Sequence, residues 1–149
     1  MGLHFTQYFA WLELLPGASV EIGSTPVEPA DQMEAAITES SPGQWTIGIE
    51  DVTQSGIYSG PFTYSTPGTS AEWIEEAPTV GGVQSTLANF GHTTFTNMAV
   101  GGSSANSTLD PVYMLNPAGT VFIAYPGTYN SSAGSFTDYY GTPPPVVTP

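Results

Sequence analysis

The chain has 149 residues, of which 40% are hydrophobic, and this fits a globular chain with a core of its own. It carries thirteen Asp and Glu residues, no Lys or Arg and two His residues, so its formal net charge at pH 7 is −13. Such a charge excludes nucleic acid as a partner, because binding phosphates requires cationic side chains, and an anionic membrane surface repels the chain for the same reason. The sequence contains no Cys, which excludes disulfides and thiolate sites.

The charge also predicts how stability depends on pH. Without Lys or Arg, the carboxylates have no cationic partners of this kind to hold them ionised. Crowded carboxylates that repel one another bind protons more tightly in the folded chain than in the unfolded chain, so acid is expected to stabilise the fold. We therefore expect greater stability at about pH 4 than at about pH 8. The alternative is that the charge serves only solubility.

The composition and the spacing of turn residues predict an all-β chain. Thr, Ser, Gly, Pro and aromatic residues dominate, and short candidate strands are separated by turn residues, as in a sandwich or a barrel. We predict one domain over residues 1–141, followed by a Pro-rich tail at residues 142–149, and a flexible loop at residues 101–107. The expected strands are 5–15, 19–22, 33–38, 44–53, 62–65, 70–76, 92–96, 111–115, 120–124 and 135–139.

The first predicted strand holds a carboxylate among apolar side chains. Its alternation places Trp11, Glu13 and Leu15 on one face. The alternative is that Glu13 simply reaches solvent, which is the commoner fate of Glu. The strand is too short to cross a bilayer.

Two further predicted strands follow in this half of the chain, at residues 33–38 and 44–53. Residues 33–38 have some helical character, but their context favours a strand. Residues 44–53 alternate well, with Trp45, Ile47 and Ile49 on one face, and predict a half-buried strand.

The predicted strand that ends at Glu76 holds the densest group of candidate catalytic side chains. Three carboxylates fall within five residues, and a period of two places Glu72, Ile74 and Glu76 on one face and Trp73 and Glu75 on the other. In general, two acids on one face beside apolar groups are a means of keeping a proton available for catalysis. The alternative is an edge strand whose solvated charges discourage aggregation.

The composition excludes most other kinds of catalytic group. The chain has no Cys nucleophile, Lys base or Arg clamp, and it lacks both a phosphate-binding loop and a Gly-x-Ser-x-Gly elbow. His4 and His92 do not have the spacing of metal ligands, and we expect neither a metal nor a cofactor. Carboxylates are left as the candidate catalytic groups.

Three motifs resemble those of the eqolisin-type (scytalidopepsin-like) glutamic peptidases. Residues 71–76 read Ala-Glu-Trp-Ile-Glu-Glu and resemble the family's Ala-Glu-Trp-Ile-Val-Glu, whose last Glu is the catalytic acid/base; this position is Glu76. Residues 8–16 are similar to the family's Tyr-x-Ala-Trp-Tyr-Glu-x-x-Pro, whose Trp and Glu line the active-site cleft, and these positions are Trp11 and Glu13. Residues 87–97 are similar to Ala-Asp-Phe-Gly-x-Val-Thr-Phe-Thr. Glu75 replaces an aliphatic residue and, lying on the opposite face, is expected to matter little.

The resemblance implies an antiparallel β-sandwich with two curved sheets, as in the concanavalin-like lectins. It also implies a secreted, acid-active endopeptidase that hydrolyses polypeptides without a metal. The sequons at Asn106 and Asn130 fit secretion, although such triplets also arise by chance.

The resemblance also implies a missing partner for Glu76. Family members pair this Glu with a Gln from strands that precede the Tyr-x-Ala-Trp segment, and Gln7 is not at that position. We therefore expect an upstream segment or a second chain to supply the Gln, and these residues alone to be a poor enzyme. The alternative is a relative that has given up the activity.

Two other functions remain open from the sequence. The first is a non-catalytic β-sandwich module that binds peptide or glycan through the aromatic groove around Trp11. The second is a structural subunit that assembles through exposed strand edges.

Overall fold

The computed structural model describes residues 6–105 and 109–144, so His4 and the sequon at Asn106 lie outside the described residues. Within these residues the regular structure is β-strand throughout, with no α-helix. The part of the chain that is described has no helix with the length and apolarity needed to cross a membrane. Contacts along the chain divide it into two units, Met1–Gly68 and Thr69–Pro149.

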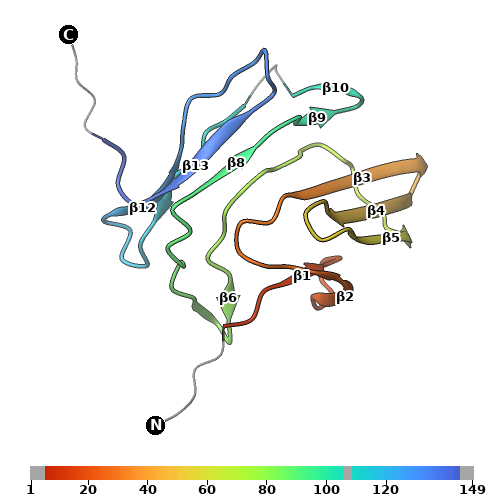
Figure 1. Ribbon diagram of the computed structural model, residues 1–149, viewed down its shortest axis with the longest axis horizontal. Helices are drawn as coiled ribbons and strands as arrows, with labels where there is room; N and C mark the ends of the chain where they lie inside the picture. The colour runs from red at the N-terminus through yellow and green to blue at the C-terminus, as the bar shows by residue number, and fades with distance from the viewer. Residues whose placement is uncertain (1–5, 106–108, 145–149) are drawn as a thin grey trace. The chain divides into compact units, whose positions relative to one another are not determined.

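The first unit contains an antiparallel strand pair and a three-stranded antiparallel sheet of order β3-β4-β5 (Figure 1). The predicted strands at 5–15, 19–22, 33–38 and 44–53 all appear, the first of them shorter and the second and third longer than expected. The elements of this unit are β1 (Phe9–Leu12), β2 (Val20–Pro26), β3 (Met33–Ser41), β4 (Gln44–Asp51) and β5 (Gly56–Thr63).

One face of the three-stranded sheet is rich in apolar side chains. The register pairs Ile47 of β4 with Ile37 of β3, and Trp45 with Phe62 of β5. Trp45 and Ile47 are both half-buried, as the alternation of residues 44–53 predicts. The indole N–H of Trp45 donates a hydrogen bond of 2.8 Å to the carbonyl oxygen of Tyr64, which ties the segment after β5 to β4.

The predicted strand at 62–65 is misplaced, because β5 begins six residues earlier, at Gly56, and ends at Thr63. Gly56, Gly60 and Pro61 interrupt the apolar pattern and hide the strand in the sequence. Pro61 is tolerated because β5 pairs with β4 and ends the sheet order, and an edge strand does not need every backbone N–H.

The second unit contains a four-stranded antiparallel sheet of order β11-β12-β13-β8 and two small hairpins (Figure 1). The predicted strands at 92–96, 111–115, 120–124 and 135–139 correspond to β8, β11, β12 and β13, with different ends. The elements are β6 (Thr79–Val80), β7 (Val83–Gln84), β8 (His92–Phe95), β9 (Ala99–Val100), β10 (Ser103–Ser104), β11 (Met114–Leu115), β12 (Phe122–Pro126) and β13 (Phe136–Tyr140).

Neither hairpin was predicted from the sequence, and each turns through two glycines. Gly81 and Gly82 have φ of 60° and 80°, and Gly101 and Gly102 have φ of 60° and 76°. Positive φ at both central residues is the geometry of the tight hairpin turn that glycine favours. The prediction of a flexible loop at residues 101–107 is therefore wrong up to Ser104, where β10 ends; residues 106 and 107 lie outside the described residues.

The segment before β6, residues 71–77, is called the strap here. The predicted strand at 70–76 is not formed, because among the described residues no strand pairs with the strap. Its alternation nevertheless persists: Trp73 and Glu75 are half-buried and Ala77 is buried, whereas Glu72 and Glu76 are exposed.

The core of the second unit joins the strap to the four-stranded sheet. Ala77 of the strap is buried in one cluster with Leu87 and with Ala124 of β12. Phe90, Met114 and Ile123 pack against this cluster. The inner face of the strap is thus fixed to the sheet. The single domain over residues 1–141 stays a prediction, and of the tail, residues 142–144 show no regular structure.

Candidate functional site

Trp11 and Glu13 lie in the first unit, on β1 and just after it. Trp11 is 45% exposed, and Glu13 and Leu15 are also exposed, whereas Ala10 is buried. The backbone N–H of Gly17 donates a hydrogen bond of 2.8 Å to the carbonyl oxygen of Leu14 and closes the following turn. The shared orientation predicted for Trp11, Glu13 and Leu15 agrees with this exposure.

Glu13 also takes part in a pocket of about 230 Å³ within the first unit. It is the charged residue of an otherwise apolar and aromatic lining, which suits an uncharged side chain of a ligand held beside one polar group. No binding role was predicted from the sequence for the β3 and β4 residues of this lining. The alternation of apolar residues in β4 was the one sign of them in the sequence. The lining residues are Glu13, Leu14, Leu15, Ile37, Trp45, Ile47 and Tyr64.

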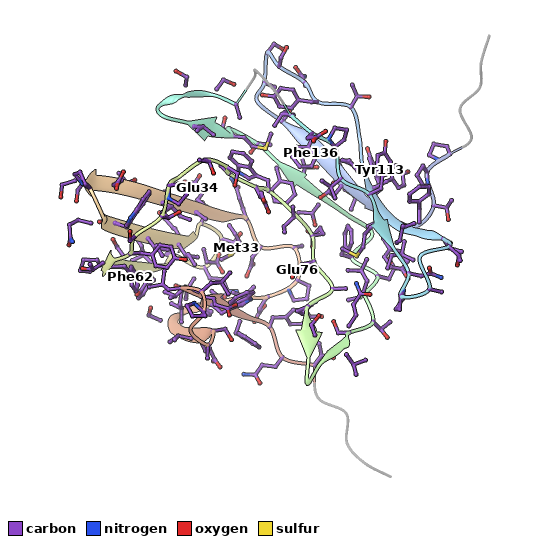
Figure 2. The ribbon with its side chains drawn as sticks, turned by 180° about the vertical axis from the view of Figure 1, so that it is seen from behind. Met33, Glu34, Phe62, Glu76, Tyr113 and Phe136 are labelled. Atoms are coloured by element: carbon purple, nitrogen blue, oxygen red, sulfur yellow. The ribbon has the colours of Figure 1, made fainter. Side chains whose placement is uncertain are left out.

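Glu76 lies in the second unit, on the strap directly ahead of β6 (Figure 2). Its side chain is exposed, and its neighbours in sequence, Glu75 and Ala77, are half-buried and buried. The strap therefore presents the Glu76 carboxylate on the side that does not pack into the unit. A carboxylate in this setting can exchange protons with water or with a bound molecule.

Asp138 is a buried acid close to Glu75 of the strap. Asp138 belongs to β13 and is only 8% exposed. Burial raises the pKa of Asp138, and the nearby carboxylate of Glu75 raises it further, whereas the backbone N–H of Glu75 interacts with the Asp138 carboxylate and lowers it. No role was predicted for Asp138 from the sequence, and Glu75 was expected to matter little. The sign that was available is an Asp in the middle of an otherwise uncharged strand.

The structure thus provides two groups of candidate residues. Trp11 and Glu13 share the first unit, and Glu76 belongs to the second; that all three line one cleft stays a prediction. Across residues 6–105 and 109–144, no three His, Asp or Glu side chains form a group that could hold a metal ion. The chemistry that these residues offer is proton transfer by carboxyl groups.

Comparisons with known proteins agree on one family. The Peptidase A4 family matches residues 4–120. Aspergillopepsin-2 from Aspergillus niger is 27% identical over 110 residues, which are 71% of this chain and 38% of that protein, so the chain spans well under two thirds of this relative.

A solved structure supports the fold. The crystal structure of aspergilloglutamic peptidase from Aspergillus niger matches with a TM-score of 0.75 and 22% identity, over 91% of this chain and 81% of that chain. This likeness confirms the predicted all-β, antiparallel sandwich. The family resemblance inferred from the motifs is also confirmed, because the match at residues 4–120 covers most of the sequence: the chain belongs to the Peptidase A4 family.

Proposed function

We propose that this chain carries the glutamate of an acid-active endopeptidase, with Glu76 as general acid/base and with Trp11 and Glu13 lining the substrate site. The observation that carries the proposal is the exposed carboxylate of Glu76 at the end of the family motif, on a strap whose inner face packs into its unit. The substrate is a polypeptide, and the working environment is extracellular and acidic.

In the proposed reaction, Glu76 takes a proton from water as the water attacks the peptide carbonyl carbon. Glu76 then passes this proton to the amine that leaves when the C–N bond breaks. Each step is a proton transfer at one carboxyl group, so the reaction needs no metal.

The developing oxyanion needs a hydrogen-bond donor that the resemblance assigns to a Gln. We propose that this Gln comes from an upstream segment or from a second chain, which agrees with a match to 38% of the length of the curated relative. The absence of such a donor typically lowers turnover by roughly 10²–10³-fold. Slow cleavage by these residues alone is the expected result.

The test compares Glu76→Gln with Glu72→Gln. Both residues are exposed on the same face of the strap, so the pair separates catalysis from loss of a surface charge. Cleavage of an unfolded protein between about pH 2 and pH 5 should fall by about 10²–10⁴-fold in Glu76→Gln and stay at the wild-type rate in Glu72→Gln. A chelator should have no effect. Equal activity of Glu76→Gln and wild type, or no cleavage by wild type at any of these pH values, would refute the proposal for this chain.

The pocket beside Glu13 favours a second candidate function. Its aromatic and apolar lining suits the binding of a peptide or glycan whether or not catalysis occurs. Saturable binding of peptides or oligosaccharides without turnover, lost in Trp45→Ala, would favour a binding module. Glu76→Gln should leave that binding unchanged.

A further inference from the structure

Glu76 lies between two residues that fix the strap to the four-stranded sheet. On one side Ala77 is buried in the cluster that includes Ala124 of β12. On the other side, Glu75 is half-buried and lies two residues from Ala77 along the strap, so both face the sheet. Asp138 on β13 is buried and lies two residues from Tyr140, the register partner of Ala124, which places its carboxyl group close to the Glu75 backbone. The strap has no strand partner among the described residues, so these two contacts stand in for the backbone ladder that would otherwise fix it.

The contact at Asp138 combines attraction and repulsion. Burial opposes the charged form of Asp138 most strongly and the Glu75 carboxylate opposes it further, whereas the Glu75 N–H stabilises it. When Asp138 is protonated, its carbonyl oxygen can still accept the N–H bond, but the charge repulsion is gone. Acid therefore keeps the attractive part of the contact and removes the repulsive part.

The other groups around Asp138 do not change this balance. Its register partners are Thr93 on β8 and Pro126 on β12, neither of which carries a charge. The neighbouring residue Tyr139 is paired with His92 and Tyr125, and successive residues of a strand point to opposite faces of the sheet. On the strap, Glu72 and Glu76 are on the exposed face, opposite to Glu75.

We propose that Asp138 is a positioning residue for Glu76, and that its contact with Glu75 forms a clamp that holds the strap against the sheet more tightly in acid. This inference rests on the proposed function of Glu76, because seating the strap matters for catalysis only if Glu76 reacts. Asp138 does not touch the substrate; it acts through the strap backbone.

The clamp is tested with three variants of the full chain. Asp138→Asn keeps an acceptor oxygen and removes the charge, so it mimics the protonated acid. Glu75→Gln removes the repulsion from the other side. Asp138→Ala removes the acceptor, and Glu72→Gln is a control for charge removal on the exposed face of the strap.

Hydrogen-exchange protection factors of residues 71–77 measure the clamp without relying on activity. In the wild type, protection should be higher at about pH 4 than at about pH 7. Asp138→Asn should keep the higher protection at both pH values, and Asp138→Ala should lose it at both. Glu75→Gln should lose less protection than the wild type at about pH 7, because the repulsion is gone but the burial of Asp138 still opposes its charge. Glu72→Gln should follow the wild type. Wild-type protection that does not change with pH, or a Glu72→Gln variant that behaves like Glu75→Gln, would overturn the proposal.

The pH profile of cleavage links the clamp to catalysis. Asp138→Ala should lower kcat on the order of a hundredfold with KM unchanged, because a displaced catalytic group affects the reaction step. Asp138→Asn should extend activity toward neutral pH. If protection behaves as expected but Glu76→Gln is fully active, the clamp stands and the proposed function fails; if Glu76→Gln is inactive but protection does not respond, the clamp fails alone.

Discussion

At the scale of single residues, Thr25 is the clearest buried polar group without a partner. It is 2% exposed, and its hydroxyl oxygen has no hydrogen-bond partner among the described residues. The backbone of β5 comes so close that a Cβ added at Gly56 would lie 3.2 Å from the Thr25 Cα. An unsatisfied buried hydroxyl lowers stability, and Val has nearly the same shape without it.

Thr25→Val should therefore raise the free energy of unfolding by about 1 kcal/mol. Thr25→Ser is the matched control: it keeps the hydroxyl but loses a buried methyl group, so it should lower the free energy of unfolding by about 1 kcal/mol. Urea denaturation of both variants measures the difference. A Thr25→Val protein less stable than wild type would mean that the hydroxyl is satisfied, for example by a bound water.

At the scale of elements, β3 and β4 place two carboxylates directly opposite each other. The register pairs Glu34 with Glu50, and Figure 2 labels Glu34 and the preceding residue Met33 near the start of β3. Like charges opposite each other across a strand pair are destabilising. Glu34→Gln should therefore raise the free energy of unfolding by about 0.2–1 kcal/mol at about pH 8.

Chemical denaturation at about pH 8 checks this prediction. Glu21→Gln is the control, because Glu21 is an exposed strand residue that pairs with the uncharged Trp11. No gain in stability in Glu34→Gln, or an equal gain in Glu21→Gln, would contradict repulsion across the strand pair.

Strands were predictable from the sequence where their own alternation defines them. The strand at 44–53 was located in this way because Trp45, Ile47 and Ile49 form a local pattern. The two-residue strands of the hairpins are too short to show a period, although their Gly-Gly turns were a usable signal. The strap was predicted as a strand because its alternation is real, but strand formation also needs a backbone partner, and alternation does not reveal one.

At the scale of the whole molecule, the candidate site was predictable only where a motif is continuous in sequence. Trp11, Glu13 and Glu76 were proposed from such motifs, and their grouping stays a prediction. Asp138 and Trp45 were not proposed, because their roles depend on contacts between distant segments: Asp138 with Glu75, and Trp45 with the pocket beside Glu13.

The stability of the whole chain should have a maximum at acidic pH, because the pKa values of two acids are shifted in opposite directions. Asp138 is buried, and Asp31 accepts hydrogen bonds. The pKa of Asp138 is raised by burial and by Glu75, so its contribution is fully present below about pH 4 and is lost as the pH rises through its folded value. The pKa of Asp31 is lowered by the backbone N–H of Glu28, at 2.7 Å, and by the side-chain amide of Gln54, at 2.6 Å. Its contribution is present above about pH 4 and is lost as the pH falls through its folded value.

The melting temperature of the wild type should therefore be highest at about pH 4, and lower both at about pH 8 and at about pH 2. Asp138→Asn should flatten the decline toward neutral pH and leave the acid side unchanged, since the Asn cannot be charged. Asp31→Asn should lower the melting temperature at about pH 5 and flatten the decline on the acid side, since it removes a carboxylate that two donors stabilise. Thermal melts of the three proteins across this range measure the profile. A wild-type melting temperature that keeps rising to about pH 8 would show that Asp138 and the other crowded carboxylates do not govern stability above about pH 4.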